Sequence, residues 1–143
     1  MKKLLLGLAA AAALTVSPVF AHHSAAMFDS TKVVVLRGTM VSFTNMNPHA
    51  WISIMGAPDE NGKPSKKSPQ RWDIEATAPV ILAMQGIQTD TLKPGDKVTI
   101  AIRPLRDGRN GGSFVFLVTP DGVAHGAKPE AVGLDLANLK PSS

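Results

Sequence analysis

The segment VVVLRGTMVSF, residues 33–43, is rich in β-branched residues and is interrupted by a single glycine, Gly38. This composition predicts a long strand that bends or carries a bulge at the glycine. A long, bent first strand suits a small barrel. The segment therefore favours a barrel, provided that the rest of the chain supplies the other strands.

Four more segments have the composition of strands: residues 49–55, 71–76, 97–103 and 113–119. The first two follow a period of two, and in a strand such alternate side chains point to opposite faces. We expect the more apolar set to face a core. The outer face then carries His49, Trp51, Arg71, Asp73 and Glu75.

One helix is expected between the third and fourth strands. Thr77 is a candidate N-cap, Pro79 would lie in the first turn, and Gly86 would end the helix. Three strands, a helix and two strands match an all-β OB-fold, a small five-stranded barrel with the helix at one end. A small β-sandwich is the alternative architecture.

The N-terminus has the parts of a secretory signal peptide. Lys2 and Lys3 precede an uncharged apolar run, and Val19 and Ala21 place small residues before a cleavage position. The run is too short to cross a bilayer of about 30 Å, so we expect no membrane span after cleavage. The expected organisation is a signal peptide at 1–21, a barrel domain with an N-terminal arm at 22–122, and a loosely packed tail at 123–143.

The composition argues against several classes of protein. The chain has no Cys, which excludes thiolate zinc and iron–sulfur sites. Without Lys2 and Lys3 it carries 13 Lys and Arg against 11 Asp and Glu, and a net charge of +2 is weak evidence for a polyanionic partner. Export, together with two Trp, five Phe and no Tyr, argues against nucleic-acid binding. No Gly-x-Ser-x-Gly motif or carboxylate pair indicates an enzyme.

Cleavage after Ala21 would make His22 the first residue of the exported chain. Its α-amino group and Nδ1 could then chelate one metal ion, and a third nitrogen would complete a T-shaped set that favours copper(II). His49 is the candidate third ligand, because it follows a proline that restrains the backbone and lies on the outer face. His23 could assist.

Two alternatives to this ligand set stay open. In the first, the amine, the deprotonated amide of His23 and the His23 imidazole wrap around the ion. In the second, none of these histidines binds a metal. The arm is then merely solvated, and the His49 ring bonds to backbone near Asn45 or Asn47.

A metal-free binding module is a different class of function. In that case Asn47, Trp51, Arg71 and the lysine-rich loop at 56–69 would hold a periplasmic partner protein or a small ligand. A copper oxidase that uses the N-terminal His is a third alternative, and it would need an open coordination position. Exposed loops and the polar tail favour a monomer.

Several motifs together resemble a family of small secreted bacterial proteins with an uncharacterised domain. They are Ala21-His22-His23-Ser24, Arg37-Gly38-Thr39, Asn47-Pro48-His49-Ala50-Trp51 and Leu92-Lys93-Pro94-Gly95-Asp96. The resemblance runs from about residue 21 to 122. It implies the periplasm of a Gram-negative bacterium and implies no activity. The motif positions that carry over are His22, His23 and Ser24, and Asn47, Pro48 and His49.

Overall fold

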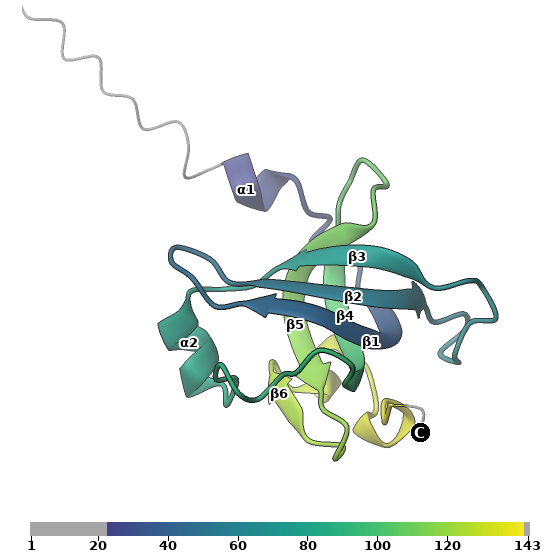
Figure 1. The fold of residues 1–143 in the computed structure, drawn as a ribbon. Helices are drawn as coiled ribbons and strands as arrows, with labels where there is room; N and C mark the ends of the chain where they lie inside the picture. Colours follow the sequence, from purple (N-terminus) through teal and green to yellow (C-terminus); the bar gives the residue numbers. More distant parts are fainter. Residues whose placement is uncertain (1–22, 142–143) are drawn as a thin grey trace, which may run out of the picture.

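The computed structural model describes residues 23–141, so the predicted signal peptide and His22 lie outside the described residues. Figure 1 shows the strands wound into a small barrel, with the C-terminal segment lying against one side. Within residues 23–141, no helix is both long and apolar enough to cross a membrane. The elements are α1 (His23–Ala26), β1 (Val34–Thr44), β2 (Trp51–Pro58), β3 (Gln70–Glu75), α2 (Pro79–Met84), β4 (Lys97–Pro104), β5 (Gly111–Val118) and β6 (Ala124–Gly126), followed by 3-10 turns at Pro129–Val132 and Leu136–Asn138.

The predicted OB-like barrel is confirmed. β1 has eleven residues and is therefore long enough to pair antiparallel with β2 on one side and with β4 on the other. The strand order is β3-β2-β1-β4-β5-β6, and the parallel pairing of β3 with β5 closes the first five strands into a barrel. The added strand, β6, pairs only with β5 and was not expected from the sequence.

The irregularity of β1 lies at a different residue from the one predicted. The pairing with β2 shifts register between Met40 and Ser42, whereas Gly38 pairs regularly with Gly56. A Cβ on Gly38 would lie 2.5 Å from the Met55 carbonyl oxygen. Glycine in a strand can mark a bulge or a close approach of two backbones, and here it permits the close approach.

The barrel interior is filled by aliphatic side chains from the inward faces of the strands, as the period-two pattern predicts. α2 covers one end and inserts Leu82, which is fully buried. The helix is capped by Ala78 without a side-chain hydrogen bond, so the predicted N-cap role of Thr77 is wrong. Thr77 instead extends the strand pairing, because its carbonyl accepts a hydrogen bond from the Ala50 amide. Gly86, at φ 84°, ends the helix as predicted.

The C-terminal segment is packed more closely than the sequence predicted. β4 and β5 are largely buried on both faces, so other parts of the chain cover the outer one. Leu139 provides part of this cover, and with 3% of its surface exposed it lies in a second core cluster with Phe116 and Val118. The leucines looked scattered in the sequence because irregular turns, not a periodic helix, bring them to the barrel.

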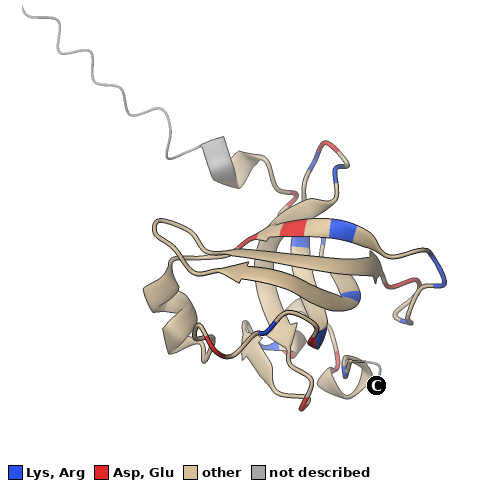
Figure 2. Cartoon of the chain, in the orientation of Figure 1, with Lys and Arg blue, Asp and Glu red and all other residues tan. Residues whose placement is uncertain are grey.

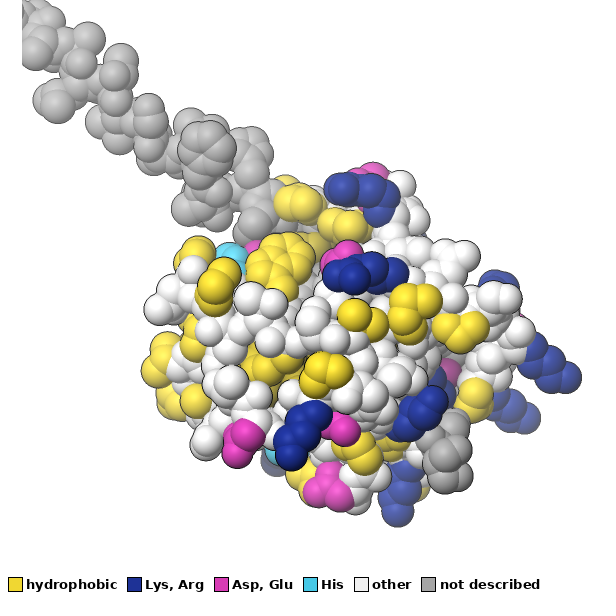
Figure 3. All heavy atoms as spheres, viewed as in Figure 1, with side chains coloured by type: hydrophobic (Ala, Val, Ile, Leu, Met, Phe, Trp, Pro, Cys, Tyr) yellow, Lys and Arg dark blue, Asp and Glu magenta, His cyan; other side chains and the backbone are white. Residues whose placement is uncertain are grey.

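Charge is distributed unevenly over the barrel. Residues 42–58 and 76–89 contain no Lys, Arg, Asp or Glu, and they form the β1–β2 loop, β2 and α2. Figure 2 shows this end without charged residues, and in Figure 3 yellow hydrophobic side chains gather there. On α2, Val80 is 65% and Met84 is 81% exposed. This end of the barrel therefore presents apolar surface, while Lys and Arg are spread over the rest of the molecule.

Candidate functional site

The β2–β3 pairing places the histidine of the Asn-Pro-His turn next to an acidic residue. Trp51 lies opposite Glu75 in the antiparallel register. Two more hydrogen bonds extend the ladder by one step, from the Ala50 amide to the Thr77 carbonyl (3.1 Å) and from the Ala76 amide to the Ala50 carbonyl (2.8 Å). His49 is thus held on the outer face, diagonal to Glu75, at a distance that two long side chains can bridge.

The two side chains are in direct contact. His49 Nδ1 contacts Glu75 Oε1, with 44% of the histidine side chain and 14% of the glutamate side chain exposed. The interaction engages Nδ1, so the ring presents Nε2 to any further partner. His49 is therefore an oriented imidazole, and its partner is a side chain rather than the nearby backbone considered from the sequence.

Two cavities lie on either side of Glu75. One, of about 360 Å³, is lined by His49, Arg103 and Ala25, among others. The other, of about 310 Å³, is lined by Trp51 and by residues of the β4–β5 loop. Glu75 and Phe28 belong to both linings. The cavities are thus neighbours that share a wall.

The N-terminal arm forms part of this wall because hydrogen bonds attach it to the end of β4. The Asp29 amide donates to the Pro104 carbonyl (2.8 Å), and the Arg106 amide donates to the Met27 carbonyl (2.9 Å). Phe28 is buried, with 9% of its surface exposed. The arm is consequently fixed against the barrel from residue 27 onward, close to the His49 cavity.

The other charged residues of the outer face form a separate network. Ser53 donates a hydrogen bond to Asp73 (2.5 Å), and Arg71 bonds both Asp73 (3.1 Å) and Ser53 (3.0 Å). Partial burial alone would raise the pKa of Asp73, but the bonds from Ser53 and Arg71 outweigh it and lower that pKa. Arg71 is therefore engaged in a local structural cluster.

The predicted site residues are brought together only in part. Asn47 is exposed in the β1–β2 loop, and neither Asn47 nor Arg71 lines the two cavities. His23 begins α1, and its side chain, like all of His22, is outside what the structure describes. Within the described residues, no group of three or more His, Cys, Asp or Glu side chains could hold a metal ion.

Glu75 is the site residue that the sequence pattern did not single out. It looked like one of three charges on the solvent face of a strand, next to Asp73 and Arg71. The one available signal was the position of Glu75 at the end of β3. In an antiparallel pair, the end of β3 lies opposite the start of β2, which follows His49. That signal becomes specific only when the register of the two strands is known.

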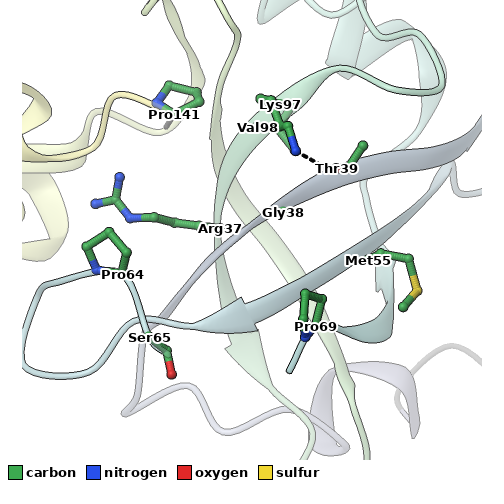
Figure 4. A pocket seen from close by; sticks show the side chains of 10 residues that line it. All are labelled: Arg37, Gly38, Thr39, Met55, Pro64, Ser65, Pro69, Lys97, Val98 and Pro141. Atoms are coloured by element: carbon green, nitrogen blue, oxygen red, sulfur yellow. Dashed lines mark hydrogen bonds between the residues drawn. The ribbon is translucent and has the colours of Figure 1, made fainter. Parts of the chain in front are cut away.

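A further cavity, of about 260 Å³, lies between β1, β2, β4 and the C-terminal segment. Figure 4 shows Lys97 bonded to Thr39 and Pro141 facing the side of the cavity where Arg37 lies. Arg37 already bonds Asp59 and the carbonyls of Asn138 and Lys140. These cations are occupied by contacts within the chain, so the cavity is a junction between structural elements.

Residues 10–114 match DUF6152, a family of unknown function. The chain belongs to this family. The match covers most of the DUF6152 barrel from α1 to β5, including both cavities and the His49–Glu75 pair. Neither the curated proteins nor the solved structures contain a match to the chain.

Proposed function

We propose that this DUF6152 protein binds copper, or another divalent metal that prefers nitrogen ligands, in the periplasm of a Gram-negative bacterium. The proposed ligands are the α-amino group and imidazole of His22, exposed by cleavage after Ala21, and the imidazole of His49. His23 assists. These ligands are nitrogens, as the absence of Cys requires and as copper(II) favours.

One observation carries the proposal: His49 is held by Glu75 at a cavity that the N-terminal arm also lines. Ala25 contributes to that lining and lies three positions after His22 in the chain. Three residues of chain span at most about 10 Å. Covalent geometry therefore keeps His22 within reach of the cavity that contains His49. Of the proposed ligand side chains, the described residues include that of His49.

Copper(II) titration of the protein that begins at His22 tests the proposal. We expect a dissociation constant below the micromolar range and an electron paramagnetic resonance spectrum with nitrogen couplings. His49→Ala should weaken binding markedly, and one extra residue before His22 should do the same. His125→Ala is the matched control, because His125 lies in β6 at a different cavity. Weak binding, or an affinity unchanged by His49→Ala, would exclude the proposal.

A metal-free binding module is the second candidate. The cavity beside Trp51, lined also by Asp73, Arg109 and Asn110, favours it, since Trp51 is 45% exposed there and could contact a small ligand or a partner protein. Under this candidate, Trp51→Ala abolishes binding of a ligand while chelators leave it intact. Under the copper proposal, chelators abolish function.

A further inference from the structure

The cavity beside Trp51 places an exposed aromatic ring next to acidic side chains. Trp51 lies opposite Glu75 in the β2–β3 register and diagonally across from Asp73. Within residues 23–141, Trp51 is the only aromatic side chain that is exposed, with 45% of its surface accessible. The other apolar residues of the lining are Met27, Phe28 and Leu105. The cavity therefore offers a flat apolar surface bordered by hydrogen-bonding groups.

Each charged side chain of this lining already contacts a polar partner. The contacts are Asp73 with Arg71, Arg109 with Asp107, and Glu75 with His49. A carboxylate with one partner keeps lone pairs that can accept further hydrogen bonds, and a guanidinium with one partner keeps N–H groups that can donate them. A ligand therefore meets these side chains as donors and acceptors rather than as free charges. This lining suits a neutral ligand whose groups both donate and accept.

The position of the cavity corresponds to the ligand face of the OB architecture. OB-folds bind oligonucleotides and oligosaccharides on the face of their second and third strands, beside the loops that join strands 1 and 2 and strands 4 and 5. Here the lining comes from β2, β3, the β4–β5 loop and the start of β5, together with the N-terminal arm. Architecture alone leaves both ligand classes open, and the side chains decide between them.

The acidic residues of β3 disfavour an oligonucleotide. Affinity for nucleic acids depends on Lys and Arg side chains that neutralise phosphates. In this cavity Asp73 and Glu75 would repel phosphates, and the guanidinium of Arg109 is engaged by Asp107. A neutral saccharide avoids this repulsion. The C–H groups of a sugar ring can lie against an indole, and its hydroxyls both donate and accept hydrogen bonds.

Hydrogen bonds hold the polar groups of the cavity in place. Ser53 donates to Asp73 (2.5 Å), and the Asp73 amide donates to the Asn110 carbonyl (3.3 Å). The Asn110 side chain donates to Gln70 Oε1 (2.7 Å). Groups that are ordered before a ligand arrives lose less conformational freedom when it binds, and this favours affinity.

We infer that the cavity beside Trp51 binds a neutral saccharide, with one sugar ring lying on the indole and its hydroxyls bonded to Asp73 and Asn110. The volume of about 310 Å³ is at the lower end of the range for small-molecule sites, about 300–1,000 Å³, so one ring is expected inside. This inference rests on the metal-free binding module, the second candidate above, and names its ligand class. It involves no metal ion.

An array of neutral, acidic and phosphorylated oligosaccharides tests the inference. The protein without its predicted signal peptide is applied in the presence of EDTA, and we expect binding to neutral members. Calorimetric titration of the strongest of these then compares the wild type with Trp51→Ala, which removes the ring, and Asn110→Ala, which removes a polar group. Met55→Ala is the matched control, because Met55 is also an exposed residue of β2 but lines the cavity near Arg37.

Trp51→Ala should weaken saccharide binding about 10-fold or more, as the loss of a stacking aromatic does for other ring ligands. Asn110→Ala should weaken it about 3- to 10-fold, as for the loss of one hydrogen bond. Met55→Ala should leave it unchanged, and circular dichroism with thermal unfolding establishes that each variant is folded. An array without a bound saccharide, a preference for acidic or phosphorylated members, or an affinity that Trp51→Ala leaves unchanged would overturn the inference.

The ligand class and the binding module fail in different ways. A ligand that depends on Trp51 but is not a saccharide, such as single-stranded DNA or a peptide, refutes the saccharide and leaves the module intact. If Trp51→Ala leaves the binding of every probe unchanged, both are wrong. The copper(II) affinity of His49→Ala bears on the metal proposal alone.

Discussion

Arg37 of β1 pairs with Asp59 after β2 and also bonds the C-terminal segment. Arg37 Nε lies 2.9 Å from Asp59 Oδ1, and only 13% and 6% of the two side chains are exposed. The same guanidinium donates to the carbonyls of Lys140 (2.7 Å) and Asn138 (2.6 Å). One side chain of β1 thereby fixes the segment whose leucine covers the outer face of β4 and β5.

Replacing Arg37 by Ala should lower the free energy of unfolding by about 3–5 kcal/mol, the usual cost of leaving one charge of a buried pair without its partner. Urea denaturation measures this change, and limited proteolysis should show earlier cleavage in residues 128–141. Arg109→Ala is the control, because the Arg109–Asp107 pair is exposed to solvent and should contribute little to stability. Equal losses from the two variants would mean that the Arg37 pair does not anchor the segment.

Gly38→Ala should destabilise the barrel by about 3 kcal/mol or more, at the upper end of over-packing costs. The added Cβ would meet the Met55 carbonyl oxygen at 2.5 Å and the Gly56 Cα at 2.8 Å, and both are backbone atoms that cannot rotate away. Thermal or urea unfolding measures the loss.

Gly108→Ala provides the comparison for Gly38→Ala. Gly108 has a φ of 79° but nothing within 4 Å of an added Cβ, so only backbone strain of about 1–2 kcal/mol is expected. If both substitutions cost the same, the close approach of β1 and β2 does not constrain Gly38.

Copper(II) bound at His49 should quench the fluorescence of Trp51. The two residues are on one face of the same extended segment, and Trp51 is 45% exposed whereas Trp72 is half-buried on the core-facing side of β3. A fluorescence titration should show partial quenching in the wild type. Trp51→Phe should remove most of the change, and Trp72→Phe should retain it. Quenching that survives in Trp51→Phe would place the ion elsewhere.

Asp29 should give the N-terminal arm a pH dependence in acid. Side-chain and backbone hydrogen bonds from Thr31 lower the pKa of Asp29 to about 2, against about 3.9 for an unfolded chain. Because the folded value is the lower one, the ionised carboxylate stabilises the fold above about pH 3.9, and this contribution is lost as the pH falls toward 2.

Urea unfolding of the wild type and of Asp29→Asn between neutral pH and pH 2 measures the contribution of Asp29. The difference in stability should be constant near neutrality and disappear at the acid end. Thr31→Val should reduce the pH dependence, since Thr31 Oγ1 donates to Asp29 at 2.6 Å. A difference that grows as the pH falls would contradict the sign of the effect.

Much of the fold follows from patterns within single segments. The period-two residues of β2 and β3 predicted which side chains face the core, and His49 and Trp51 are on the outer face as expected. The order of strands and helix predicted the barrel, since few topologies accommodate a long first strand, two more strands, a helix and two strands. The cleavage site and the metal ligands at His22 and His23 stay predictions from sequence.

Other features depend on which segments become neighbours. The pairing of His49 with Glu75, the close approach of Gly38 to Gly56 and the anchoring of the C-terminal segment by Arg37 all join residues far apart in the chain. Alternation is a local property of a strand and can be recognised in sequence. Register is a property of two strands, and shifting it by one residue would turn the entire outer face inward. Only the tertiary structure could therefore show that the histidine of the Asn-Pro-His turn has an acidic partner.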